Sequence, residues 1–376
     1  MLFSKRTNWD RKPNALNQLM DELKLQGAAI VDLTESNPTR CAFAYPPEIL
    51  QSLPDAKNLQ YAPDSMGTLP AREAAGRFCR FDPRRTILTS STSESYAYLF
   101  RLLLDPGDKV LVPRPGYPLF QFLLELNDAH YEHYPLVYDQ GNWRIDFNRL
   151  ERLIDGRTKA IIVVNPNNPT GSYVKAEELR RLSAVCRKHG LAIISDEVFF
   201  DYRLNDGPFV SLREHNDVLT FVLGGLSKSM GLPQMKLGWM LVNGPDGLVN
   251  EALARLEIIA DTFLSVNTPA QNALAAWLAH AETMRTQILQ RVKSNLECLT
   301  KSGVNVLSVE GGWYAVVHAG HIDEESFVLD TLRRHHILVH PGFFFDFELP
   351  GHLVLSLLPP QERFVKIISV LGGQDG

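Results

Sequence analysis

Cysteine is scarce in this 376-residue chain, and no two cysteines form a C-x-x-C pair. The four present, Cys41, Cys79, Cys186 and Cys298, are spread over most of the sequence. Scattered cysteines are typical of reduced thiols in a cytosolic protein, and they argue against a disulfide framework or a cysteine-ligated metal. We therefore expect a cytoplasmic protein without a metal site.

Long apolar runs and an excess of basic charge are also missing. No stretch approaches the roughly 20 apolar residues that span a bilayer, and the opening segment MLFSKRTNWDRKPN lacks the apolar core of a signal peptide. The 38 Lys and Arg residues are balanced by 43 Asp and Glu, giving a net charge of −5. With no basic stripe to bind phosphate backbones, we expect neither nucleic acid nor a membrane as a partner.

What the chain does have is apolar content, 45% of its residues, enough for a large core. Short runs rich in Val, Ile and Leu, without polar alternation, predict strands buried on both faces of a sheet. These runs are residues 86–89, 109–112, 160–164, 192–195 and 219–223. Residues 175–189 carry apolar side chains at helical spacing and end before Gly190. Alternating strands and helices predict an α/β fold with a mostly parallel central sheet flanked by helices.

The last third of the chain has a different pattern. Residues 253–260 and 270–298 predict long helices, whereas residues 313–317 and 353–357 predict short strands. This change predicts a second, smaller α+β domain.

Polar residues follow the predicted strands, at the edge where open parallel sheets bind ligands. They are Ser91, Thr92 and Ser93 at the start of a helix, Tyr117 in P-R-P-G-Y-P, Asn168 in N-P-N-N-P-T-G, Asp196 after residue 195, and Lys228 at the end of G-G-L-S-K. Each alone has an ordinary explanation as a turn, a helix cap, a packed aromatic or a solvated lysine. Together they place an amine, an acid, an amide, an aromatic ring and hydroxyls on one sheet edge.

This set of groups matches the requirements of pyridoxal 5′-phosphate (PLP). Lys228 offers the amine for a Schiff base with the cofactor's aldehyde, and Asp196 can hold the proton on the ring nitrogen. The amide of Asn168 can donate to the O3′ oxygen, and Tyr117 can stack on the ring. The phosphate suits the hydroxyls and backbone N–H groups of residues 91–93 at a helix N-terminus.

Four segments carry a resemblance that covers nearly the whole chain. They are D-P-G-D-K-V-L-V-P-R-P-G-Y-P at 105–118, N-P-N-N-P-T-G at 165–171, S-D-E-V at 195–198 and S-K-x-x-G-L at 227–232. In these the sequence resembles the class I/II aminotransferases of PLP fold type I, the aspartate aminotransferase family. The resemblance implies a PLP-dependent aminotransferase that moves an amino group from an amino acid or amine donor to a keto or aldehyde acceptor.

The resemblance also implies a domain division and further site residues. The large PLP-binding domain would span residues 46–269, and the small domain would combine residues 1–45 with 270–376. Ser227 and Lys236 would lie near the phosphate, with Lys236 where the family usually has arginine. Tyr61 would reach the phosphate of a neighbouring subunit, because the family builds its sites at a homodimer interface.

Two further departures concern the cofactor's O3′ oxygen and the substrate carboxylate. Phe199 stands where the family usually has a tyrosine, and Val354 stands where it has the arginine that grips the substrate α-carboxylate. Either another cation replaces that arginine, or the substrate has no carboxylate there. Arg40, together with Asn37, is our first candidate for substrate binding, and Arg114 is the second.

Two other function classes remain open at this point. A fold type I PLP enzyme of another reaction class, such as a lyase, decarboxylase or synthase, would share the fold and cofactor. A PLP-sensing regulatory module is less favoured, since the chain has no additional helix-turn-helix segment and no basic face.

Overall fold

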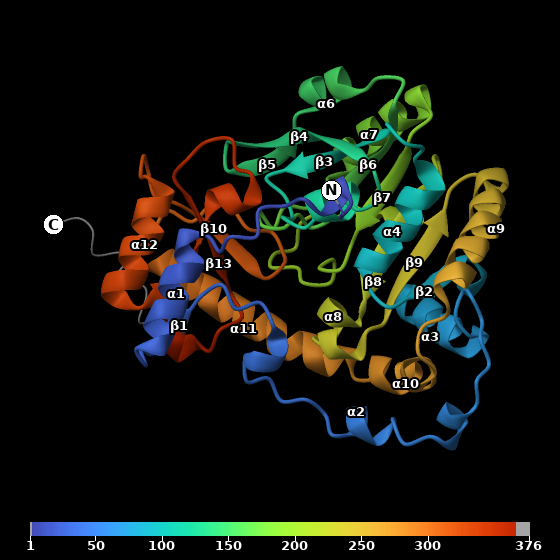
Figure 1. Cartoon of the computed structure of the whole chain (residues 1–376), viewed down its shortest axis with the longest axis horizontal. Helices are drawn as coiled ribbons and strands as arrows, with labels where there is room; N and C mark the ends of the chain where they lie inside the picture. The colour runs from blue at the N-terminus through green and yellow to red at the C-terminus, as the bar shows by residue number, and fades with distance from the viewer. Residues whose placement is uncertain (1, 366–376) are drawn as a thin grey trace.

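An eight-stranded sheet forms the centre of the computed structural model, which describes residues 2–365 (Figure 1). From one edge of the sheet to the other, the strands are β2 (Thr86–Thr89), β9 (Gly238–Asn243), β8 (Thr220–Gly225), β7 (Ala192–Asp196), β6 (Thr158–Val164), β3 (Lys109–Arg114), β4 (His130–Asp139) and β5 (Asn142–Ile145). Strands β4, β3, β6, β7 and β8 run parallel, whereas β9 and β5 are antiparallel to their neighbours. The predicted α/β fold with a mostly parallel sheet is confirmed.

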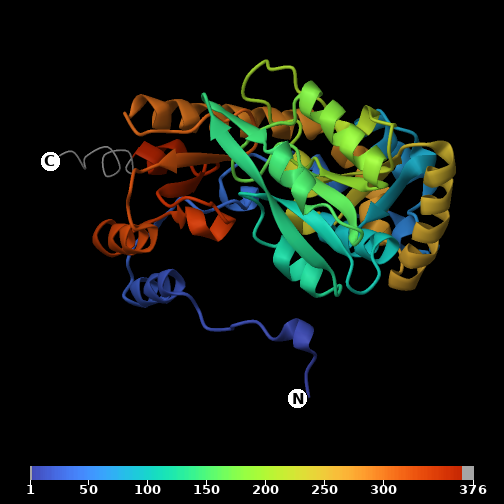
Figure 2. The same cartoon turned by 90° about the horizontal axis from the view of Figure 1, so that it is seen from above.

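Helices cover both faces of this sheet, because alternate residues along each strand point to opposite sides. In β6, Ile161 and Val163 enter one core, while Ala160, Ile162 and Val164 enter the other. The first core is completed by α3 (Leu69–Cys79), α6 (Phe147–Leu153), α7 (Ala176–His189) and α10 (Thr268–Leu278). The second is completed by α4 (Thr92–Leu103), α5 (Phe120–Glu125) and α9 (Asp246–Phe263), as the view from above in Figure 2 shows.

A smaller body lies beside the large sheet and combines both ends of the described chain. It contains the antiparallel sheet β10 (Tyr314–His318), β13 (His352–Ser356) and β12 (His340–Pro341), the parallel pair β1 (Val31–Asp32) and β11 (Ile337–Leu338), and the helices α1 (Ala15–Leu25), α11 (Ala281–Lys301) and α12 (Glu324–His335). The N-terminal segment joins this body through β1, whose backbone pairs with β11. Phe199, Tyr202 and Trp313 belong to its core, so the loop after β7 packs into the small body.

The prediction of one long helix over residues 270–298 is wrong. The segment forms two helices, α10 and α11, which meet at His280. Helix α10 packs on α3 and on α2 (Glu48–Gln51), and Trp277 donates a hydrogen bond to the backbone oxygen of Ile49 at 2.9 Å. Helix α11 instead buries Ile288 and Val292 in the small body. Each half has helical periodicity, so the sequence did not reveal that the two halves face different cores. Helix α10 thus packs with the large sheet, beyond the boundary expected after residue 269.

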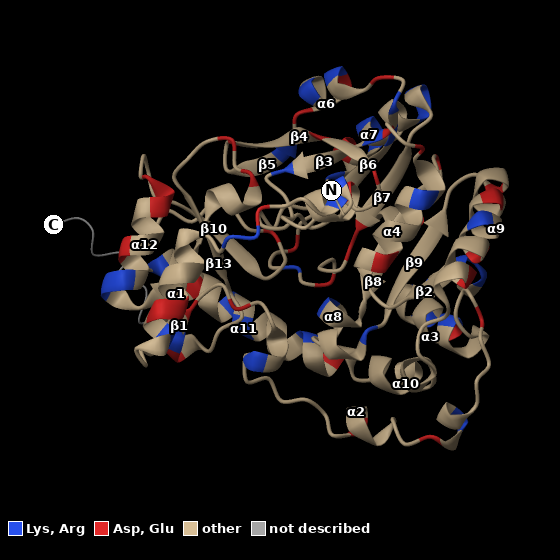
Figure 3. Ribbon diagram, in the orientation of Figure 1, with Lys and Arg blue, Asp and Glu red and all other residues tan. Residues whose placement is uncertain are grey.

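Charged residues are interspersed on the outer helices, with both signs present on α7, α9 and α12 (Figure 3). Among residues 2–365, none of the helices has the length and apolar character needed to cross a membrane. The four cysteines are free, and all but Cys298 are buried.

Candidate active site

The carboxyl ends of the parallel strands meet at one edge of the large sheet. The register pairs Val164 with Asp196 and Asp196 with Leu223, so β6 and β7 end level and β8 ends two residues further on, at Gly225. Tyr117 and Asn168 lie in the loops after β3 and β6. Asp196 is the last residue of β7, and Lys228 lies in the short helix after β8. The structure therefore brings these four predicted site residues to a single edge.

Asp196 is the buried acid of this edge, with 7% of its surface exposed. Its Oδ2 accepts a hydrogen bond from the hydroxyl of Tyr96 at 3.2 Å, and its Oδ1 accepts one from the backbone N–H of Val198 at 3.2 Å. Burial raises the pKa of Asp196 to about 6, while these hydrogen bonds and the nearby Lys228 act in the opposite direction. At neutral pH the side chain therefore supplies a negative charge in a region of low dielectric.

Lys228 lies in the short helix α8 (Leu226–Ser229), directly after β8. Burial lowers the pKa of its amine to about 8, against the raising effect of Asp196. The Nζ atom is 5.1 Å from the ring centroid of Trp313 and 5.5 Å from that of Phe199. Tyr202 donates a hydrogen bond to the backbone oxygen of Lys228 at 2.5 Å and fixes α8 in place. The environment thus favours an amine that is uncharged part of the time, which is the nucleophilic form.

The two central asparagines of N-P-N-N-P-T-G have different surroundings. Oδ1 of Asn167 accepts hydrogen bonds from the backbone N–H of Thr170 at 3.2 Å and from its hydroxyl at 2.9 Å, so this side chain shapes the loop. Asn168 is only 8% exposed, and its Oδ1 atom is buried without a hydrogen-bond partner among the described residues. Buried polar atoms are normally paired, so Asn168 is free to meet a ligand.

The start of α4 lies at the same edge, because β2 runs in the same direction as β8. Ser91 caps the helix by accepting the backbone N–H of Glu94 at 3.2 Å, and Glu94 accepts the backbone N–H of Ser90 at 2.6 Å. The serine hydroxyl is therefore used by the cap, while Thr92 and Ser93 form the first turn. A Cβ atom at Gly238 would lie only 3.4 Å from Thr89 Oγ1, so β9 approaches this turn closely. Free N–H groups at a helix N-terminus suit a phosphate.

Three other predicted cofactor residues lie around this centre. Ser227 is half-buried beside Lys228 in α8. Lys236 is exposed and has a left-handed backbone with a φ of 49°. Tyr61 is 78% exposed on the surface of the single chain.

The residues predicted for the substrate carboxylate are less central. Arg40 has a side chain that is 74% exposed and lies 3.6 Å from the carboxylate of Glu35. Oδ1 of Asn37 accepts the backbone N–H of Thr39 at 3.1 Å and caps a short turn. The segment itself lies close to Lys228, because a Cβ at Gly231 would come within 3.3 Å of its Pro38. The role of Arg40 and Asn37 stays a prediction.

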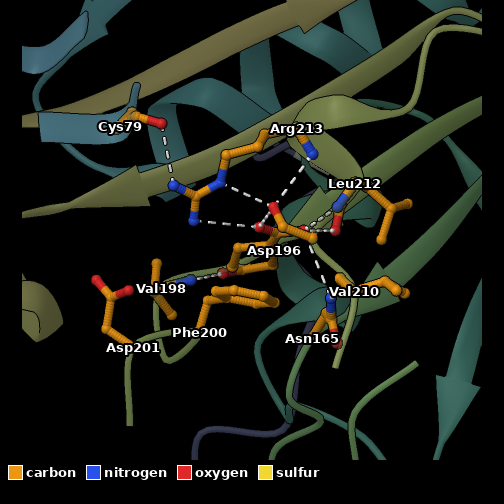
Figure 4. Close-up of polar contacts among 12 residues, drawn as sticks. Cys79, Asn165, Asp196, Val198, Phe200, Asp201, Val210, Leu212 and Arg213 are labelled. Atoms are coloured by element: carbon orange, nitrogen blue, oxygen red, sulfur yellow. Dashed lines mark hydrogen bonds and ion pairs between the residues drawn. The ribbon is translucent and has the colours of Figure 1, made fainter. Parts of the chain in front are cut away.

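Two buried residues of the site were not found from the sequence. Tyr96 lies on α4, and nothing in its position indicated a contact with Asp196. Glu197 was visible only as part of S-D-E-V, yet its carboxylate accepts the backbone N–H of Leu212 at 2.7 Å and the hydroxyl of Ser211 at 2.5 Å. Asn165 donates to the same carboxylate at 3.4 Å, and Arg213 lies 3.8 Å from it. Figure 4 shows Asn165, Leu212 and Arg213 around this polar group, next to Asp196. Burial raises the pKa of Glu197.

The residues at this edge fit PLP, given an amine of lowered pKa, a buried carboxylate, a buried asparagine whose amide N–H can donate to O3′, and a helix N-terminus. The comparisons point the same way. Residues 29–364 match the family model described as aminotransferase class I and II. An alanine aminotransferase of Mycobacterium tuberculosis is 31% identical, over 95% of this chain and 88% of its own length. A glutamate-pyruvate aminotransferase of Escherichia coli is 29% identical, over 90% of this chain and 88% of its own length.

Solved structures agree in fold. An alanine aminotransferase from Pyrococcus furiosus superimposes with a TM-score of 0.87 at 26% identity, covering 99% of this chain and 100% of its own. An aminotransferase from Escherichia coli gives a TM-score of 0.86 at 26% identity, covering 99% and 98%. The chain therefore belongs to the class I and II aminotransferases, has the fold type I architecture, and transfers amino groups with PLP as its cofactor.

Proposed function

We propose that Lys228 attaches PLP covalently and then carries the proton of the reacting substrate carbon. Bound PLP supplies an electron sink for the charge that develops at that carbon. The amine of Lys228, with its pKa lowered to about 8, is a nucleophile near neutral pH and a base of suitable strength for proton transfer. The aromatic rings of Trp313 and Phe199 lie 5.1 and 5.5 Å from it.

Asp196 would hold the proton on the ring nitrogen. Its carboxylate is ionised above a pKa of about 6 and is fixed by Tyr96 and the backbone of Val198. Asn168 would meet the ring oxygen and Tyr117 would lie against the ring face. The observation that carries this proposal is the pairing of a buried acid and a shielded amine on one sheet edge.

The phosphate would be held by residues 91–93 at the start of α4, with Ser227 and Lys236 nearby. The side chain of Lys236 would supply a point charge, without the bidentate geometry of a guanidinium. The enzyme would act as a homodimer, in which the exposed Tyr61 reaches the phosphate of the partner subunit.

We also propose a cytoplasmic location. The four free cysteines, three of them buried, suit a reducing compartment.

The test of this function is the covalent attachment itself. Borohydride reduction of the PLP-loaded enzyme followed by peptide mapping should place the cofactor on Lys228. Lys228→Ala should lose both the reduced adduct and multiple turnover, whereas Lys301→Ala, on an exposed face of α11, should keep both. A cofactor mapped to any other lysine would refute the assignment.

A further inference from the structure

A cavity of about 650 Å³ lies on the face of the large sheet that packs against α3 and α7. Its walls come from the end of α3, from α7, from β8 and β9, and from the loop between β7 and β8. Small-molecule sites in proteins commonly have volumes of roughly 300–1,000 Å³, so this cavity is large enough for a ligand. Phe200, Asp201 and Arg213 of its lining are labelled in Figure 4.

The cavity lies on the other side of the strand ends from Asp196. Asp196 contacts Tyr96 in the core beneath α4, whereas Glu197 lines the cavity and contacts Leu212 in the core beneath α7. Neither Asp196 nor Lys228 belongs to the lining. A ligand in this cavity could therefore be bound at the same time as PLP.

Aromatic side chains form much of the cavity wall. Phe78, Phe200, Phe209 and Trp239 all line it. The rings of Phe78 and Trp239 meet edge to face with centroids 5.6 Å apart, which holds both in place. Walls of this kind suit a ligand with an aromatic body.

The deeper charged groups of the cavity are paired with one another. Arg285 lies 3.5 Å from the carboxylate of Asp201. Arg213 lies 3.8 Å from the carboxylate of Glu197, which also accepts the backbone N–H of Leu212. These four side chains balance in charge, so the rim decides which charge a ligand should carry.

The rim has more positive than negative charge. Arg80, Arg203 and Glu214 line the cavity and are exposed, and none of the three forms an ion pair with another described residue. The guanidinium of Arg203 lies 4.9 Å from the ring centroid of Phe200 and 5.9 Å from that of Phe209. A flat cation is thus held beside the aromatic wall, where its N–H groups can bind a carboxylate.

The lining also contains a polar atom whose hydrogen bond is not made within the protein. Nε2 of His215 is buried without a hydrogen-bond partner among the described residues. Burial lowers the pKa of His215, so the ring is neutral at pH 7. Buried polar atoms are normally paired, and this one is available to a ligand or to water that accompanies it.

We propose that this cavity is a second ligand site, which binds a small organic carboxylate with an aromatic body while PLP occupies the cofactor edge. The aromatic body lies between the rings of Phe200 and Trp239. The carboxylate lies toward Arg203 and Arg80 at the rim.

The test measures binding directly, by isothermal titration calorimetry of the PLP-loaded enzyme. The probe is 1-naphthaleneacetate, and its uncharged match is 1-naphthaleneacetamide. We expect the acid to bind with a dissociation constant roughly tenfold or more below that of the amide, because hydrogen bonds to a charged group are stronger than neutral ones. Equal binding of the two probes, or binding of neither, would overturn the proposal.

Variants locate the bound probe. Replacing both rim cations, by Arg80→Met and Arg203→Met together, should weaken binding of the acid roughly tenfold or more and change that of the amide little. Arg334→Met, on an exposed face of α12, removes an arginine elsewhere and should leave both affinities unchanged. An acid affinity that survives in the double variant would place the probe outside this cavity and overturn the proposal.

A second kind of variant fills the cavity and keeps its charges. Val210→Trp adds an indole ring to the wall and should weaken binding of both probes. Unchanged binding in a folded Val210→Trp protein would contradict the proposed location. If this variant does not fold, as judged by its thermal melt, the exposed arginine variants still decide. Since no step of the test depends on turnover, its failure would leave the proposed function intact.

Discussion

The hydroxyl of Tyr96 donates a hydrogen bond to the carboxylate of Asp196 at 3.2 Å, joining the second turn of α4 to the end of β7. Both side chains are buried, and burial together with the adjacent carboxylate raises the pKa of Tyr96 well above its usual value. The phenol therefore stays protonated and always donates. The bond favours the ionised form of Asp196, which burial alone would disfavour.

Tyr96→Phe should consequently make the ionised form of Asp196 less favourable while leaving the carboxylate in place. Losing one hydrogen bond to a charged group predicts a roughly tenfold to hundredfold lower kcat, since such bonds contribute about 1.5–3 kcal/mol. Asp196→Asn removes the charge itself and should cost roughly 10³-fold or more. Single-turnover rates with thermal melts as a folding check would measure both. Equal rates for Asp196→Asn and the unchanged enzyme would rule out the ring-nitrogen role.

The lowered pKa of Lys228 predicts a pH dependence for cofactor capture. Only the neutral amine attacks an aldehyde, so covalent binding of PLP to cofactor-free enzyme should accelerate as pH rises and level off above about 8. Asp196→Asn removes the negative charge that raises this pKa, so its midpoint should move to lower pH. Stopped-flow absorbance over a pH series measures the midpoint. A value near 10.5, the ordinary pKa of lysine, would contradict the shielded environment.

Much of the fold and site was predictable because each signal was local. Buried strands form continuous apolar runs, and a parallel sheet collects the loops after those runs at one edge, which brought Asn168, Asp196 and Lys228 together. The contact between Tyr96 and Asp196 could not be found in this way, since Tyr96 lies inside helix α4 and not at the end of a strand. The break between α10 and α11 was missed because the apolar residues of both helices recur at helical spacing. The spacing does not show that the two helices pack on different cores.

The hydrogen bonds of Glu197 predict that its replacement lowers the stability of the fold, separately from any effect on catalysis. Its buried carboxylate binds the loop after β7 through Ser211 and the backbone of Leu212, so Glu197→Ala would leave those donors unpaired. The free energy of unfolding should fall by about 2–4 kcal/mol, the range for breaking a buried polar network. Glu297→Ala, which removes an exposed partner of Lys301, should change it little. Urea unfolding of the three proteins measures this. A loss no larger in Glu197→Ala than in the control would show that the network does not stabilise the fold.

Tyr61 offers a test of the shared site that combines the Lys228→Ala and Tyr61→Ala variants, each of which we expect to lose activity by itself. If Tyr61 serves the partner subunit, a hybrid of one Lys228→Ala chain and one Tyr61→Ala chain contains one complete site, with Lys228 from the second chain and Tyr61 from the first. Random mixing makes about half of the dimers hybrid, and each hybrid has one complete site out of two. Activity should therefore recover to about a quarter of the unmutated level. If Tyr61 instead serves its own chain, every hybrid site lacks one of the two side chains and mixing restores nothing. Measuring turnover after unfolding and refolding the two variants together, against each refolded alone, distinguishes these outcomes. Recovery would support the homodimer. It would also support the proposal that Tyr61, which is exposed on the single chain, contacts the cofactor of the partner subunit.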